Sequence, residues 1–360
     1  LSFLVNFDST VAIPIIALYA KELGASIILI GLIVGVYSMV HIPSNIFFGR
    51  LVDKLGRKHL ITIGVFLDGI SMLLYFLANN PIFLLFARVI HGIGGGFGGP
   101  ATMAYLSDAT SKERSGRVMA LYGISIGFAN LIGFMLGGMV AQIIGFSNLF
   151  LIIGILLIIM AFLSFGLPSI YQKRETSITF KQEFKIVKQT IFRKVMISPY
   201  FSAIALMFNM GIITATYTVM LGDLYYSGQI GMILSIMVIF SILIHYPAGI
   251  LSDKIGYTKV MLIGLLFLVL TFGILMISLE APIPMIGMVF FGIGHGLIFP
   301  SSAGAIKENT PNSESGLATG MFYALIVAGV AIGAPISALV YDFSTIQITL
   351  LLGIFSPLIV

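Results

Sequence analysis

The sequence has no cysteine, and only 9% of its 360 residues are charged. The absence of cysteine excludes disulfides, thiolate metal sites and cysteine nucleophiles. An average soluble domain carries roughly 25% charged residues, whereas 58% of the residues here are hydrophobic, which excludes a soluble fold. The first residue is Leu1 and the first cation is Lys21, so the basic opening of a signal peptide is missing. We expect the chain to be a trimmed core.

Apolar runs long enough to cross a bilayer as helices fill the chain. They cover residues 2–22, 27–49, 59–78, 81–106, 115–144, 147–169, 196–221, 229–250, 259–279, 283–306, 315–341 and 345–360. The pattern predicts an all-α membrane protein with twelve transmembrane helices in two pseudo-symmetric six-helix bundles. The bundles are expected at 1–169 and 196–360, joined by a cytoplasmic linker at 170–195.

The linker carries seven Lys or Arg residues beside apolar positions such as Phe180 and Phe184. We interpret part of it as an amphipathic helix on the membrane surface. Its cations are expected to face anionic lipid rather than nucleic acid.

The positive charges predict the orientation. All but two of the 19 Lys and Arg residues lie in the linker or in loops after even-numbered runs. Cytoplasmic loops carry an excess of these residues, so both termini are expected to be cytoplasmic in the cell membrane.

An internal repeat relates the two halves. Gly49-Arg-Leu-Val-Asp53-Lys-Leu-Gly56 returns 200 residues later as Gly249-Ile-Leu-Ser-Asp253-Lys-Ile-Gly256. The same offset relates Gly92 to Gly292, Pro100 to Pro300 and Gly133 to Gly333, among others. Parallel six-helix repeats are typical of secondary transporters with a site between the halves.

The loop from Gly49 to Lys58 resembles the signature loop of the major facilitator superfamily, and Arg88-Val-Ile-His-Gly92-Ile-Gly94 resembles its fourth-helix motif. The chain is similar to the branch of twelve-helix drug/proton antiporters. The resemblance implies a cytoplasmic gate in which Gly49 allows close helix approach and Asp53, Arg57 and Asp108 form a charge cluster. Gly249 and Asp253 are the weaker second copy.

The fifth helix departs from the antiporter pattern. Phe134 stands where that pattern has proline, within Gly133-Phe-Met-Leu-Gly137-Gly138. The direction of transport therefore stays open at this point, and so does the alternative that these glycines only pack helices.

Three charges inside apolar runs are the candidate coupling residues: Asp8, Asp68 and Arg88. Charge within a bilayer is costly and marks function. We expect Asp8 to carry a proton, Asp68 to carry it instead or to pair with Arg88, and Arg88 to join the coupling network. Met288 replaces Arg88 in the second half, so the charge is asymmetric.

The repeat geometry also predicts cavity residues. These are Asn6, Tyr37, His41, His91, Asn130, Asn209, Met210, Tyr217, Phe291, His295 and Tyr323. His41 shares one face of the second run with Tyr37, Ser44 and Asn45. No two histidines have zinc-ligand spacing with a carboxylate neighbour, so no metal site is expected.

We therefore expect a monomeric secondary transporter, not an enzyme, in contact with membrane lipid. It would export drug-like or amphipathic small molecules in exchange for protons, with no cofactor besides the coupling proton. The alternative is an uptake symporter or facilitator for a small organic anion or sugar, with Arg88 gripping the anion. No ATP-binding loop is present.

Overall fold

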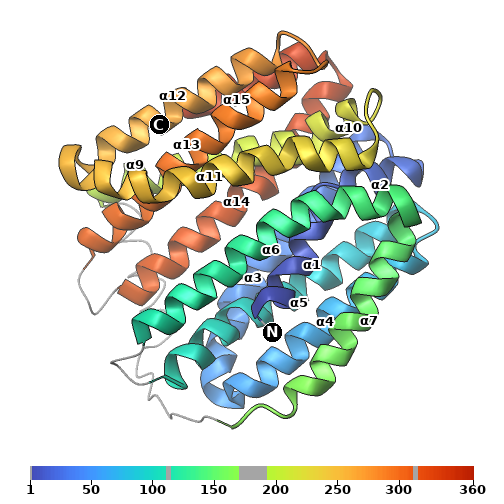
Figure 1. The fold of residues 1–360 in the computed structure, drawn as a ribbon, viewed down its shortest axis with the longest axis vertical. Coiled ribbons are helices and arrows are strands. Elements are labelled where there is room, and N and C mark those ends of the chain that lie inside the picture. Colours follow the sequence, from blue (N-terminus) through green and yellow to red (C-terminus); the bar gives the residue numbers. More distant parts are fainter. Residues whose placement is uncertain (1, 111–114, 170–192, 311–314) are drawn as a thin grey trace. The chain divides into compact units, whose positions relative to one another are not determined.

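A computed structural model describes residues 2–110, 115–169, 193–310 and 315–360, and the regular structure within these ranges is helical (Figure 1). In chain order the elements are α1 (Ser2–Ala12), α2 (Ile16–Glu22), α3 (Ile27–Leu55), α4 (Arg57–Leu77), α5 (Pro81–Asp108), α6 (Ser115–Ile144), α7 (Phe146–Ser164), α9 (Lys194–Ile212), the π-helix η1 (Ile213–Tyr217), α10 (Thr218–Leu221), α11 (Ser227–Ile255), α12 (Tyr257–Leu275), α13 (Ile283–Glu308), α14 (Ser315–Asp342) and α15 (Ile346–Leu358).

Ten helices in the described ranges are long and apolar enough to cross a membrane. The predicted all-helical membrane fold is therefore confirmed. The first predicted span is instead broken between α1 and α2 around Pro14, because proline lacks the amide hydrogen that a continuous helix needs. Its repeat counterpart widens into η1 over Ile213–Tyr217 and continues.

The helix bounds follow the 200-residue repeat. α3 and α11 begin at Ile27 and Ser227, and α4 and α12 begin at Arg57 and Tyr257. The turns before α4 and α12 use Gly56 and Gly256, both at positive φ, a conformation that glycine adopts without steric cost. The repeat found in the sequence is thus a repeat of helices.

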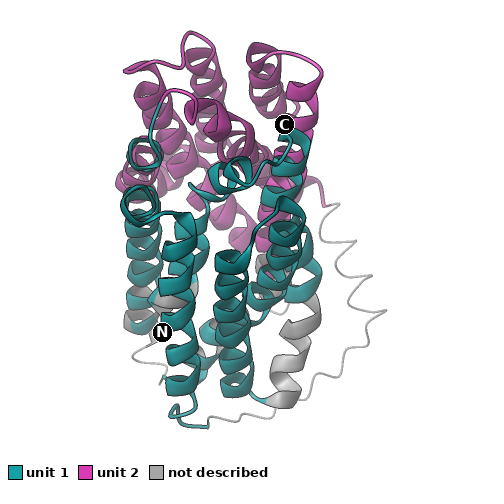
Figure 2. Ribbon diagram, turned by 90° about the vertical axis from the view of Figure 1, so that its right-hand side faces the viewer, with its two compact units in different colours: residues 1–174, 225–232 teal, residues 175–224, 233–360 magenta. Residues whose placement is uncertain are grey.

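The chain divides into two compact units (Figure 2). One comprises residues 1–174 and 225–232, and the other comprises 175–224 and 233–360. The expected bundles at 1–169 and 196–360 have similar bounds, except that 225–232 group with the first unit. The amphipathic helix expected in the linker falls at 170–192, outside the described residues.

Glycines of α6 bring that helix against α1. A side chain at Gly133 would collide with Thr10, and one at Gly137 would meet the carbonyl oxygen of Val11 at 2.7 Å. The Thr10 hydroxyl also donates to the carbonyl of Ala129, at 3.0 Å. Small residues allow such close approach, so these glycines fix the position of α1 and of the acid it carries.

Candidate functional site

A cluster of ionisable and hydroxyl side chains is buried inside the first unit. We call it the acid cluster, and define it as Asp8 on α1, Asp68 and Tyr75 on α4, and Arg88 and His91 on α5. Each is at most 6% exposed. Three separate helices therefore place charge at one point, where a charge is costly unless it has a function or a partner.

The hydrogen bonds of the acid cluster form a chain in which the donors lead from Arg88 to Asp8. Arg88 Nη1 donates to the Tyr75 hydroxyl at 3.4 Å, and that hydroxyl lies 2.8 Å from His91 Nδ1. Because the hydroxyl accepts from Arg88, its own hydrogen is available for Nδ1. In the neutral ring the remaining hydrogen is then on Nε2, 3.3 Å from Asp8 Oδ2.

Arg88 is held mainly by backbone. Its Nε donates to the carbonyl of Ile33 at 3.0 Å and its Nη2 to that of Val34 at 3.2 Å. The guanidinium carbon lies 4.8 Å from the centre of the Tyr37 ring, a cation–π distance. The expected pairing of Arg88 with Asp68 is not found: none of its bonds among the described residues goes to a carboxylate.

Asp68 has a carboxylate oxygen that could still accept a hydrogen bond or bind a proton. Its Oδ1 is buried and has no hydrogen-bond partner among the described residues. Gly94 provides its space, since a side chain there would collide with the Asp68 carboxylate. By contrast, Asp8 accepts from the Ser9 amide at 2.6 Å as well as from His91.

Ligand atoms of Asp8, Asp68 and His91 all lie within 4.8 Å of one another. The sequence argument against a metal site required two closely spaced histidines with a carboxylate neighbour, whereas folding joins one histidine and two distant carboxylates. This corrects that argument: the donor set is one that a cation could use. When both carboxylates are ionised and His91 is neutral, the single charge of Arg88 leaves the acid cluster with one negative charge in excess.

The second unit builds the same helices without this cluster. The residues 200 positions after Asp8, Asp68, Tyr75, Arg88 and His91 are Phe208, Leu268, Leu275, Met288 and Phe291. Four of these five are essentially inaccessible, like their counterparts, and Phe208 is half-buried. The fold therefore needs only apolar side chains at these positions, and packing does not account for the acid cluster.

Two other predicted cavity residues, Tyr37 and His41, lie beside the acid cluster. The Tyr37 and His41 rings stack at 5.4 Å, and the Asn45 amide lies 3.4 Å from the His41 ring. Tyr37 also meets His91 edge to face at 4.8 Å. Asn6 and Asn130 are half-buried on α1 and α6.

In the second unit the predicted cavity residues fall into two groups. Asn209 is a correction, because it is fully buried and its amide bonds the carbonyl of Gly353 at 3.2 Å and the hydroxyl of Ser356 at 2.9 Å. It ties α9 to α15 instead of facing a cavity. Tyr217 and Phe291 are buried too. Half-buried or exposed positions are Met210, His295 and Tyr323.

The predicted gate is described in part. Arg57, the first residue of α4, forms a buried ion pair with Asp108, the last residue of α5. The surroundings of Gly49 and the side chain of Asp53 lie outside what the structure describes. In the second copy Asp253 is exposed. A side chain at Gly249 would meet nothing within 4 Å among the described residues.

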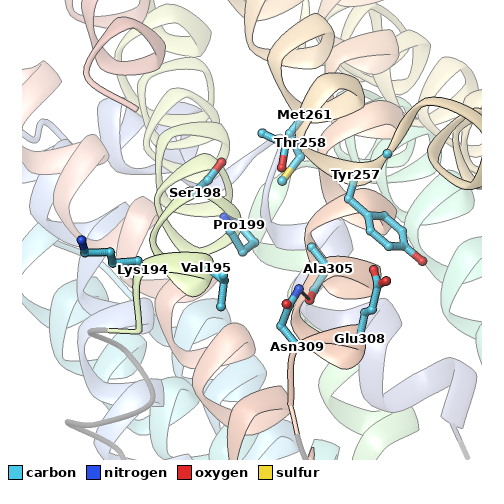
Figure 3. Close-up of a pocket in the computed structure, with 11 residues that line it drawn as sticks. Lys194, Val195, Ser198, Pro199, Tyr257, Thr258, Met261, Ala305, Glu308 and Asn309 are labelled. Atoms are coloured by element: carbon cyan, nitrogen blue, oxygen red, sulfur yellow. Dashed lines mark hydrogen bonds between the residues drawn. The ribbon is translucent and has the colours of Figure 1, made fainter.

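A pocket of about 350 Å³ lies in the second unit, between the starts of α9 and α12 and the end of α13. Lys194 is on one side of it and Glu308 on the other (Figure 3). Tyr257 and Glu308 occupy the positions that Arg57 and Asp108 hold in the first repeat. The pocket contains none of the predicted site residues.

Sequence reasoning missed Ser9 and Tyr75. The Ser9 hydroxyl lies 3.3 Å from both Tyr37 Oη and His91 Nε2. Comparison of the repeats position by position could have found Tyr75, since its counterpart is Leu275.

The model of the Major Facilitator Superfamily matches residues 1–227 and 200–360. An uncharacterised MFS-type transporter of Methanocaldococcus jannaschii is 27% identical over 330 residues, covering 89% of this chain and 84% of that protein. The multi-drug resistance efflux pump PmrA of Streptococcus pneumoniae is 24% identical over 327 residues, covering 87% and 80%.

Among solved structures, the nucleoside transporter NupG superimposes with a TM-score of 0.81 at 16% identity, covering 99% of this chain and 95% of that one. At this identity the likeness concerns the fold alone. Because the family matches across the described helices, the chain belongs to the Major Facilitator Superfamily and is a membrane transporter, not an enzyme.

Proposed function

We propose that the protein exports drug-like or amphipathic small molecules in exchange for protons. It would do so as a monomer in the cell membrane by alternating access. In this proposal α1 with α2, and α15, complete the ten long helices to twelve spans in two six-helix bundles, and both termini are cytoplasmic. The observation that carries the proposal is the acid cluster, which the second repeat replaces with apolar residues.

The charge balance of the acid cluster favours a proton as the coupling ion. Asp8 and Asp68 are both buried and repel each other when both are charged. Arg88 compensates one of the two charges. Binding of one proton removes the remaining excess charge, and the unpartnered Asp68 oxygen offers it a position.

Proton occupancy can then bias the conformational equilibrium. A charged acid cluster favours a state in which water reaches it, whereas a neutral one is buried at less cost. A ligand shifts an equilibrium by its differential affinity for the two states. Release of the proton on one side and binding on the other would therefore drive the alternation.

The substrate class is inferred from side-chain chemistry and from one relative. The chain contains 29 Phe, 14 Tyr and 18 Met, and such side chains adapt to bulky ligands of different shape. PmrA, a multi-drug resistance efflux pump, is similar over most of the chain. Both support amphipathic substrates.

Uptake of an organic anion or sugar is the alternative. It relies on Arg88 as the anion-binding group, but three donors of this side chain already bond Ile33, Val34 and Tyr75. The two N–H groups that remain belong to a side chain that is only 6% exposed, and an anion that reached them would meet the carboxylates of the acid cluster. The geometry therefore favours a role for Arg88 inside the acid cluster.

The test uses purified protein in liposomes with a pH gradient of either sign and a fluorescent permanent cation, the diamino derivative of N-methylacridinium. Export in exchange for protons predicts uptake of the probe into vesicles with an acidic lumen, because protons leave as the probe enters. A symporter predicts uptake only with acid outside. A permanent cation is not trapped by protonation, and protein-free vesicles measure leakage.

The variant Asp8→Asn should lose gradient-driven accumulation but keep exchange of probe across the membrane without a gradient, because loss of one of the two carboxylates removes the excess charge that a proton would otherwise neutralise. Asp342→Asn, at an exposed helix end, is the matched control and should behave like the wild type. Full gradient-driven accumulation in Asp8→Asn would contradict the proposal.

A further inference from the structure

A second polar group lies in the other unit, on α11 and α13. We call it the imidazole cluster, and define it as Ser241 and His245 on α11 with His295 and Phe299 on α13. The two imidazole rings are 5.8 Å apart, centre to centre. His295 and Phe299 stack at 5.6 Å with planes 6° apart, and His245 lies 6.0 Å from Phe299. The three rings thus contact one another, and both imidazoles contact Ser241.

Hydrogen bonds assign the ring hydrogens in this cluster. His245 Nδ1 contacts the backbone carbonyl of Ser241, and a carbonyl can only accept, so the hydrogen of the neutral ring is on Nδ1. Its Nε2 is then an acceptor. The Ser241 hydroxyl occupies His295 Nδ1, at 2.7 Å. Among the described residues neither Nε2 atom has a partner.

The rings of the imidazole cluster remain accessible. His245, His295 and Phe299 are half-buried, whereas Ser241 beneath them is buried. Phe299 packs against the apolar core of the unit and meets Phe322 of α14 at 5.6 Å. The rings are therefore held in place by the core on one side and partly exposed on the other. Such an arrangement offers a ligand a rigid surface to bind.

Packing alone does not require these residues. In the first repeat the positions of Ser241, His245 and His295 are held by His41, Asn45 and Gly95. At position 95 the helices α3 and α5 leave no room for a ring, since a side chain at Gly95 would collide with Tyr37. The imidazole cluster is thus an addition specific to the second unit.

We propose that the imidazole cluster binds the planar aromatic part of the transported molecule, and that His245 Nε2 accepts a hydrogen bond from an N–H or O–H group on that ring. The inference rests on the proposed function and specifies its substrate class. Phe299 and the imidazole rings supply the flat apolar contact. His245 supplies the preference for aromatic amines and phenols over aromatics without a donor.

Two probes separate these contributions. N-methylacridinium and its diamino derivative are both planar permanent cations and differ in the two amino groups. Fluorescence titration of purified protein in nanodiscs, without any gradient, measures their affinities. We expect the wild type to bind the diamino probe about tenfold more tightly, as one hydrogen bond to a shielded acceptor allows.

Variants then assign the preference to one atom. His245→Leu should remove the tenfold preference and leave the affinity for N-methylacridinium unchanged. Phe299→Leu should weaken both probes equally. Tyr246→Leu, at the neighbouring and 79% exposed position, is the control and should bind both probes as the wild type does.

Equal affinity of the wild type for the two probes would by itself overturn the inference, whatever the variants do. Equal weakening of both probes by His245→Leu would also overturn it, because the histidine would then be structural. Failure of the proposed function is separate: in that case gradient-driven uptake is absent while the preference between probes persists.

Discussion

The carboxylate of Asp8 and the imidazole of His91 lie 3.3 Å apart, Oδ2 to Nε2, although 83 residues separate them in the chain. Both are fully enclosed by the first unit. On its other nitrogen His91 meets Tyr75, so one ring links the acid of α1 to Arg88 of α5 through a hydroxyl of α4. Asp8 and Arg88 are therefore connected through the hydrogen bonds of His91 and Tyr75 and do not bond each other directly.

Tyr75→Phe tests this link. The substitution keeps the ring but leaves His91 Nδ1 and one Arg88 donor without their partner, which costs about 1–3 kcal/mol for a buried polar group. We expect a lower melting temperature in detergent and a slower gradient-driven uptake. Tyr246→Phe, on the exposed surface, should change neither measurement. Wild-type rates and stability in Tyr75→Phe would show that the link is unimportant.

Asp68→Leu introduces the residue that the second repeat carries at Leu268. Since a buried carboxylate oxygen without a partner is unfavourable, we expect the free energy of unfolding to stay the same or to rise by roughly 1 kcal/mol. Gradient-driven transport should nevertheless be lost. Thermal unfolding and liposome uptake on the same preparation check both parts. A variant that is stable and still fully coupled would remove Asp68 from the coupling site.

Arg57→Tyr introduces at the start of α4 the residue that the second repeat carries at Tyr257. Removing one partner of a buried ion pair leaves Asp108 uncompensated, with an expected cost of about 3–5 kcal/mol. Adding Asp108→Ala should recover part of that loss, because the unpaired carboxylate is gone. Thermal unfolding of the two single variants and the double variant gives the coupling energy. Strictly additive effects would mean that the pair contributes nothing.

Gly137→Ala tests the contact of α6 with α1. Its new methyl group would meet the Val11 carbonyl at 2.7 Å, so we expect a loss of about 1–3 kcal/mol in stability. Gly127→Ala in the same helix meets nothing described within 4 Å and should gain about 0.5–1 kcal/mol. Melting temperatures that shift the same way in both variants would contradict the assigned packing role.

The sequence by itself determined the helical membrane fold, the repeat and the superfamily. These depend on local properties: the length of apolar runs, and motifs such as Gly49 to Lys58 that keep their spacing. It also singled out Asp8, Asp68 and Arg88, because a charge in an apolar run is visible without a structure.

Only the tertiary structure decided what these residues contact. Tyr75 and Ser9 are ordinary in sequence and acquire a role because α1, α4 and α5 bring them to His91. Asn209 was predicted to line a cavity, but its side-chain amide forms its hydrogen bonds with Gly353 and Ser356 of α15. Hydrogen bonds between residues more than 80 positions apart depend on helix packing and rotation, which the apolar pattern of each helix leaves undetermined.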